Sequence, residues 1–177
     1  MAQSAFIVRV PEAEALVGGL RERFDPSARQ GVPAHITVLY PFMSPELLSE
    51  QVLAGVRQAL LPMQPFEFQL PKIGRFSATT YLTPHPVAPF VGLTRRLVER
   101  FPEYLPYGGE HAGVVPHLTV AHGSPEEAAI AEAELSAAIA ARSVIYSTCR
   151  EVVLLENSGG LWREIHAFSL SPGAAGS

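Results

Sequence analysis

The sequence predicts an α+β fold of two pseudo-symmetric lobes that face a central cleft. The first observation behind this prediction is a repeated segment, GVPAHITV at 31–38 and GVVPHLTV at 113–120. The second is that strand-like and helix-like patterns follow one another in the same order around both copies. A repeat of about 80 residues that occurs only twice is too long for a solenoid unit. We therefore expect one domain with halves 1–78 and 79–177, each an antiparallel sheet with two helices.

The first half begins with strand and helix patterns in alternation. A β-rich run at 5–10 ends before Pro11, and apolar residues from 13 to 24 then recur at helical spacing. Ser44-Pro45-Glu46 has the composition of a helix start, because serine supplies an N-cap oxygen and proline suits the first helical position. The expected elements are a strand at 5–10, a helix at 13–24, a strand at 35–40, a helix at 44–59 and a strand at 66–70.

The second half repeats this order. Ser124-Pro125-Glu126-Glu127 is another Ser-Pro-Glu helix start, with a glutamate placed for a capping box. Asn-Ser-Gly-Gly at 157–160 separates two strand-like runs and indicates a hairpin. The expected elements are a strand at 79–82, a helix at 90–101, a Gly-bearing loop at 102–116, a strand at 117–121, a helix at 125–141 and strands at 152–155 and 162–170.

The composition favours a compact globule that binds small ligands. Apolar residues make up 47% of the 177 residues and charged residues 17%, which is enough for a substantial core. The net charge is −4 and Lys72 is the only lysine, whereas proteins that follow a long polynucleotide carry a basic stripe. We expect a monomer whose phosphate-bearing partner is small or a strand end, with no long duplex nucleic acid.

The cysteine count and the first residues bear on the cell compartment. Cys149 is the single cysteine, so the sequence predicts no disulfide framework and no cysteine-based zinc site. The opening MAQS lacks the pattern of a secretory signal, and no apolar run approaches the roughly 20 residues that span a bilayer. We expect a cytoplasmic protein without a membrane partner. Because no His-x-x-x-His spacing is present, we expect neither a metal nor another cofactor.

Each repeated segment carries a histidine and a threonine two residues apart in an expected strand. Alternate residues of a strand share a face, so His35 and Thr37 point to one side, as do His117 and Thr119. The apolar residues between them suit a helix-covered face, which leaves the His/Thr pairs for the cleft. Two imidazoles, each with a neighbouring hydroxyl, would then face one pocket.

Such a pocket suits in-line displacement at phosphorus. One imidazole can take a proton from the attacking oxygen while the other gives a proton to the leaving oxygen, and histidine titrates near neutral pH. The threonine hydroxyls can donate to the phosphoryl oxygens in the transition state. We therefore expect His35, Thr37, His117 and Thr119 to be catalytic, without a metal ion. The acid and base roles stay open between the two histidines.

Residues near the motifs are candidates for substrate binding. Aromatic side chains can stack on a nucleobase, an arginine can pair with phosphate, and a histidine at a strand end can reach the rim of a cleft. The predicted substrate-binding residues are Tyr40, Phe42, Arg75, Phe76, Tyr107 and His122. In the Gly-bearing loop, His111 is a candidate lid residue.

The two motifs also resemble those of a known family. HITV at 35–38 and HLTV at 117–120, together with the duplicated order, are similar to the two-histidine (2H) phosphoesterase superfamily. AHITVLYPF at 34–42 resembles its 2′-5′ RNA ligase-like branch, and the likeness extends to GRF at 74–76 and GLW at 160–162. The resemblance implies a bilobal fold and metal-independent cyclic phosphodiesterase or ligase chemistry, with His35 and His117 as the acid/base pair. It does not identify the substrate.

The leading hypothesis is an enzyme that hydrolyses a 2′,3′-cyclic phosphate on a nucleotide or a short RNA end. One alternative is a non-catalytic protein that binds nucleotides or RNA ends. Both motif histidines are intact, which favours the enzyme, because binding alone would tolerate glutamine or asparagine. The other alternative is a metal-dependent hydrolase.

Overall fold

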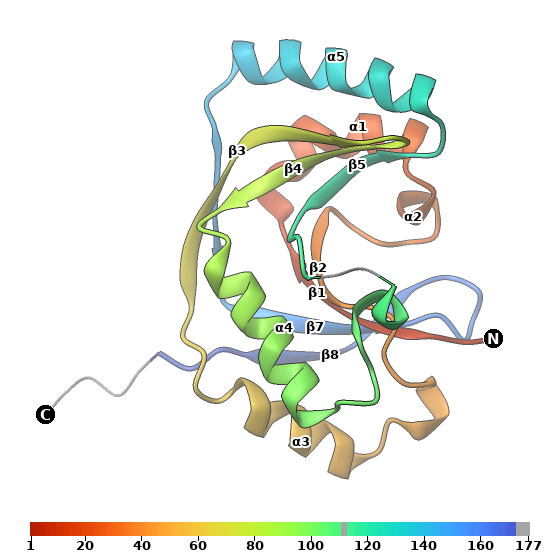
Figure 1. The fold of residues 1–177 in the computed structure, drawn as a ribbon, viewed down its shortest axis with the longest axis vertical. Helices are drawn as coiled ribbons and strands as arrows, with labels where there is room; N and C mark the ends of the chain where they lie inside the picture. The colour runs from red at the N-terminus through yellow and green to blue at the C-terminus, as the bar shows by residue number, and fades with distance from the viewer. Residues whose placement is uncertain (111–112, 173–177) are drawn as a thin grey trace, which may run out of the picture.

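A computed structural model describes residues 1–110 and 113–172 of the chain. Within these residues, eight strands form one curled antiparallel sheet in the order β6-β3-β4-β5-β2-β1-β7-β8 (Figure 1). The α+β class expected from the sequence is confirmed. The strands are β1 Ser4–Arg9, β2 His35–Leu39, β3 Phe66–Phe76, β4 Thr79–His85, β5 Leu118–His122, β6 Ile145–Cys149, β7 Glu151–Glu156 and β8 Arg163–Ser169.

The sheet consists of two four-stranded halves that meet between β2 and β5. A single residue pair, Ile36 with Leu118, joins these two strands. The two expected sheets are therefore continuous with each other through the two strands that carry the repeated motifs. The halves of the sheet do not follow the halves of the sequence. β3 lies beside β4 and β6, whereas β7 and β8 return to the side of β1.

Two longer helices accompany each half of the sheet. α1 and α5 pack on each other and on β5, whereas α4 packs on β2, and α3 packs on α4 and β8. Figure 1 shows α5 and α1 together over the β3–β5 half, with α3 at the opposite end. The helices are α1 Glu14–Phe24, α2 Pro26–Arg29, α3 Glu50–Leu60, α4 Ala88–Arg100 and α5 Pro125–Ala141.

The alternation of side chains along the strands produces two apolar layers. In β1, Phe6 belongs to the main core under the helices, whereas Ile7 belongs to a small cluster on the other face. Val32, Val153 and Leu155 complete that small cluster, and Trp162 packs against it. The face of the sheet opposite to the main core is thus partly apolar.

Two helix starts differ in how well the sequence predicts them. α5 begins as expected, with Ser124 accepting from the Glu127 backbone N–H and the Glu127 carboxylate accepting in return. At 44–46 the expected start forms only a single 3₁₀ turn, Pro45–Leu47, because Leu48 is extended. α3 begins at Glu50 instead, where the Ser49 side chain accepts from Val52 N–H.

Candidate active site

A cavity of about 860 Å³ is lined by residues of both repeated motifs. Its walls also include parts of β1, α2, β7 and the segments that precede β2 and β5. A second cavity of about 430 Å³ is lined by residues of β3, β6 and the end of β4, and contains no motif residue. We therefore describe the larger cavity as the candidate site.

The four motif residues share one face of the sheet. Ile36 and Leu118, the pair that joins β2 to β5, are fully buried in the core. Extending this antiparallel register by one residue to either side sets each histidine across from the threonine of the other motif. Diagonal neighbours on one face of a sheet lie about 7–8 Å apart at Cα, so the two histidines are within reach of one ligand. All four motif residues line the cavity, although β5 begins one residue after its histidine.

Both imidazoles are anchored in the same way. Nδ1 of His35 donates to the Pro33 carbonyl at 2.8 Å, and Nδ1 of His117 donates to the Val115 carbonyl at 2.6 Å. A carbonyl can only accept, so each neutral ring carries its proton on Nδ1. Nε2 of each ring is then the basic nitrogen. This repeated contact two residues upstream fixes both tautomers, as the second partner of a catalytic imidazole does.

Burial disfavours the charged form of both rings. It lowers the pKa of His35 to about 4, although the hydrogen bond to Pro33 acts in the opposite direction. Charges nearby contribute as well, since Arg21 and His117 lower this pKa and Asp25 raises it. Burial also lowers the pKa of His117, against the hydrogen bond to the Val115 carbonyl. Near neutral pH both rings are therefore neutral in the free protein.

An aromatic cluster supports the ring of His117. The ring centroids of Tyr81 and Phe76 lie 5.3 and 5.9 Å from that imidazole, and 4.6 Å from each other. Gly74 lies opposite Tyr81 in the β3–β4 register, and a Cβ at that glycine would overlap the tyrosine ring. The glycine thus makes room for the ring that packs against the histidine.

Tyr40, Tyr107 and Trp162 form an aromatic wall on another side of the cavity. The ring of Tyr40 meets those of Tyr107 and Trp162 edge-on, with centroids 6.3 and 6.2 Å away. The Tyr107 hydroxyl is hydrogen-bonded with Thr37, and burial raises the pKa of this tyrosine. The aromatic wall therefore adjoins one of the two motifs.

The structure brings most, but not all, of the predicted substrate-binding residues into the cavity. Tyr40, Phe76, Tyr107 and His122 line it, and Nδ1 of His122 is 2.8 Å from the hydroxyl of Thr79. The other two predicted residues, Phe42 and Arg75, lie elsewhere. The predicted lid residue His111 lies outside the described residues.

Phe42 and Arg75 are each held by other parts of the fold. Phe42 is 4% exposed and packs on Phe6, Phe101 and Tyr104 in the main core, so it has no free face for a nucleobase. The guanidinium of Arg75 donates to a carboxylate of α5 at 2.6 Å and to two backbone carbonyls nearby. Neither residue is among those that line the cavity.

Sequence reasoning missed several residues of the site. Tyr81 supports a motif histidine, and Asp25, Ser27 and Gln30 form part of the cavity wall. In the sequence, Trp162 is notable only as part of the GLW segment at 160–162. That segment does not indicate that the tryptophan lines the cavity. The spacing of these residues carries no signal for the site, because the fold brings them there from distant parts of the chain.

The described residues contain neither a cluster suited to a metal ion nor a helix that could span a membrane. Across 1–110 and 113–172, no three histidine, cysteine, aspartate or glutamate side chains gather as a metal site would require. Over the same ranges, every helix is too short or too polar to cross a membrane.

Comparison with known proteins identifies the family. Residues 9–161 match the 2′-5′ RNA ligase superfamily. Among curated proteins, "Putative phosphoesterase Bcer98_0945" of Bacillus cytotoxicus is 34% identical over 103 residues, which cover 58% of this chain. The match spans 59% of that relative, which is less than two thirds of its length.

Two solved structures are similar in fold. E. coli LigT in complex with 3′-AMP has a TM-score of 0.64 at 14% identity, over 96% of this chain and 98% of LigT. TT0787 of Thermus thermophilus has a TM-score of 0.58 at 17% identity, over 97% of this chain and all of that one. At these identities the likeness concerns the fold alone. The family match over most of the sequence is the stronger finding, and by it the chain belongs to the 2′-5′ RNA ligase superfamily of two-histidine (2H) phosphoesterases.

Proposed function

We propose that the protein is a cyclic phosphodiesterase that opens 2′,3′-cyclic phosphates on nucleotides or short RNA ends. The observation that carries this proposal is the pair of imidazoles that line one cavity, each with Nδ1 bonded to a carbonyl and Nε2 left basic. Membership of a phosphoesterase family supports the reaction type.

In the proposed reaction one histidine acts as base and the other as acid. The basic Nε2 takes a proton from water as the water oxygen attacks phosphorus. The bond from phosphorus to the 2′ or 3′ oxygen breaks, and the protonated Nε2 of the other ring donates its proton to that oxygen. The product is a ribose phosphomonoester with one free hydroxyl. Either His35 or His117 can serve as base, depending on how the substrate lies.

The threonines and the phosphate charge complete the proposed mechanism. Thr37 and Thr119 would donate hydrogen bonds to the non-bridging oxygens, on which charge accumulates in the transition state. The substrate phosphate is an anion, so its entry raises the pKa of both rings and lets one of them gain the required proton. No step of this mechanism calls for a metal ion, because side chains supply both the acid and the base.

The cavity dimensions and the aromatic wall favour a nucleotide-sized substrate. About 860 Å³ lies within the usual range of small-molecule sites, roughly 300–1,000 Å³. Tyr40 and Trp162 offer aromatic surface for a nucleobase. Among proteins of similar fold, E. coli LigT has been crystallised with 3′-AMP, with NADP+ and with ATP. Ligation is the same ring opening with an RNA 5′-hydroxyl in place of water as the attacking group, and it would use the same residues.

The test is turnover of nucleoside 2′,3′-cyclic phosphates in the presence of a chelator. The wild-type protein should turn over substrate, and His35→Ala and His117→Ala should each lower kcat by about 10²–10⁴-fold, the usual contribution of general acid or base catalysis. His85→Ala is the matched control, because His85 is exposed and lines only the other cavity. Binding without turnover would instead indicate a nucleotide sensor. Activity lost to the chelator and restored by metal would indicate a metal-dependent hydrolase.

A further inference from the structure

A buried ion pair lies directly behind the segment that orients His35. Arg21, at the end of α1, is 2% exposed, and Asp25 is 3% exposed. Nε of Arg21 donates to the Asp25 carboxylate at 3.1 Å, and Nη2 donates to the Ser27 hydroxyl at 3.1 Å. Nη2 also donates to the Val32 carbonyl at 3.0 Å. The guanidinium thus connects the end of α1 to the segment that precedes β2.

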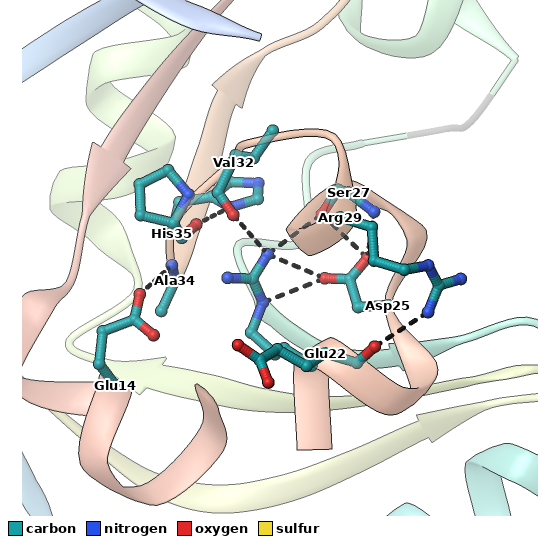
Figure 2. Close-up of polar contacts among 10 residues, drawn as sticks. Glu14, Glu22, Asp25, Ser27, Arg29, Val32, Ala34 and His35 are labelled. Atoms are coloured by element: carbon teal, nitrogen blue, oxygen red, sulfur yellow. Dashed lines mark hydrogen bonds and ion pairs between the residues drawn. The ribbon is translucent and has the colours of Figure 1, made fainter. Parts of the chain in front are cut away.

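The segment from Val32 to Ala34 is held on both sides of the residue that anchors the imidazole. On one side, Val32 accepts from the guanidinium of Arg21. On the other, Ala34 N–H donates to the Glu14 carboxylate at 2.6 Å, and its carbonyl accepts from Val10 N–H at 2.9 Å. Between them lies the Pro33 carbonyl that accepts from Nδ1 of His35. Figure 2 shows these contacts, apart from the one from Val10, meeting the segment that leads into His35 from α1 and from the turn after it.

Burial of this ion pair removes two charges from water, and this desolvation costs free energy. A contribution to stability alone therefore does not explain why the pair is buried. Well-packed apolar residues in place of a buried ion pair are often neutral or stabilising. A pair two residues further along illustrates the cheaper arrangement, since Arg23 on the same helix binds Glu134 with both side chains about half exposed. The buried pair also reaches the site, because Asp25 and Ser27 line the cavity.

We propose that Arg21 and Asp25 are positioning residues, which hold His35 in its working orientation through Val32 and Pro33. The effect of this orientation on catalysis rests on the proposed function. Asp25 holds the guanidinium, the guanidinium holds the Val32 carbonyl, and the neighbouring Pro33 carbonyl holds the ring. Nε2 is thereby directed at a fixed point in the cavity. A histidine without this support would keep its place in β2 but lose the fixed direction of its proton transfer.

The same pair also acts on His35 electrostatically, which gives the proposal a signature that a purely structural role lacks. The charged groups that act on this ring are Arg21, Asp25 and His117. Arg21→Met leaves an unpaired carboxylate near the ring and should raise the pKa of His35. Asp25→Asn leaves an unpaired guanidinium and should lower it. The double variant removes both charges, and the two shifts should largely cancel.

The experiment combines NMR titration of the imidazoles with steady-state kinetics on a nucleoside 2′,3′-cyclic phosphate. In Arg21→Met and Asp25→Asn, the pKa of His35 should move in opposite directions while that of His117 stays within error. Both variants should lower kcat by about 10²-fold, the cost of a catalytic group displaced by about 1 Å, with KM changed much less. Arg23→Met, the matched control on the same helix, should change neither quantity.

Several results would overturn the proposal. Folded variants with an unchanged His35 titration and an unchanged kcat would overturn it, as would equal shifts at His35 and His117. If Arg21→Met does not fold, Arg21→Lys serves in its place: it keeps the charge but loses the three-way donor geometry, so kcat should fall with little change in pKa. Wild-type protein without turnover would contradict the proposed function alone, because the opposite shifts at His35 test the positioning network without any substrate.

Discussion

Protonation of His35 should make the protein sensitive to mild acid. Burial lowers the pKa of this ring to about 4 in the folded protein, whereas an unfolded chain has an ordinary histidine pKa of about 6.5. Below about pH 6.5 the unfolded state therefore binds a proton that the folded state does not. The stability associated with the neutral ring is complete above that pH and is lost progressively as the pH falls from about 6.5 to the folded pKa of about 4.

The size of the effect follows from the gap between the two pKa values. Each pKa unit corresponds to about 1.4 kcal/mol, so the full gap of about 2.5 units corresponds to about 3.5 kcal/mol. Between about pH 7.5 and about pH 5 the linkage relation gives a loss of about 2 kcal/mol. Since the ring borders a cavity that admits water, we expect a measured loss of about 1–2 kcal/mol.

Urea denaturation at a series of pH values measures this loss. His35→Gln keeps a polar side chain of similar reach but cannot be protonated, so its free energy of unfolding should fall less between these pH values than that of the wild type. His85→Gln controls for an exposed histidine. If His35→Gln and the wild type lose the same free energy on acidification, His35 is not buried as a neutral ring and the reasoning is refuted.

Three other substitutions test how the cavity walls are built. Gly74→Ala places a methyl group where the Tyr81 ring lies, and it should lower kcat by displacing the ring that packs on His117, with thermal melting to verify the fold. Trp162→Ala should raise KM for cyclic nucleotides by about tenfold, near the low end of the loss expected for one stacked base. An unchanged KM would show that Trp162 does not stack on the nucleobase. Gly31→Ala should lower Tm by several degrees, because this residue has φ +94° and an added Cβ would lie 2.9 Å from the Trp162 carbonyl oxygen; a Tm equal to the wild type's would show that the loop can rearrange.

The fold class and the shared face of the motif residues were predictable because they depend on local periodicity. In β2, Ile36 and Val38 are buried in the main core while His35 and Thr37 line the cavity, as alternation along a strand requires. The capping box of α5 was predictable for the same reason. Each of these features depends on residues that are close together in the sequence.

The errors concern contacts between distant parts of the chain. From the sequence, Arg75 is expected to be a free cation beside a glycine. In the structure, Glu132 on α5 forms an ion pair with its guanidinium. Phe42 follows the strand that carries the first motif, yet the chain has left β2 by then and its ring enters the core. β6 was missed because Ile145–Cys149 has only five residues, too few for a clear alternation of apolar and polar side chains.

The arrangement of strands shows a second limit of local reasoning. The sequence repeat indicates two halves, but it does not reveal that β3 joins the strands of the later half or that β7 and β8 join β1. The buried pair of Arg21 and Asp25 shows the same limit. Its i, i+4 spacing is visible in the sequence, but on a helix such a spacing usually marks a solvated pair.

A structure of the complex with a nucleoside 2′-monophosphate, one of the two products that the proposed ring opening allows, tests the central claim most directly. We predict that oxygens of a single phosphate group lie within about 3 Å of Nε2 of both His35 and His117. A phosphate bound to one ring alone, or outside the cavity that both motifs line, would contradict the account.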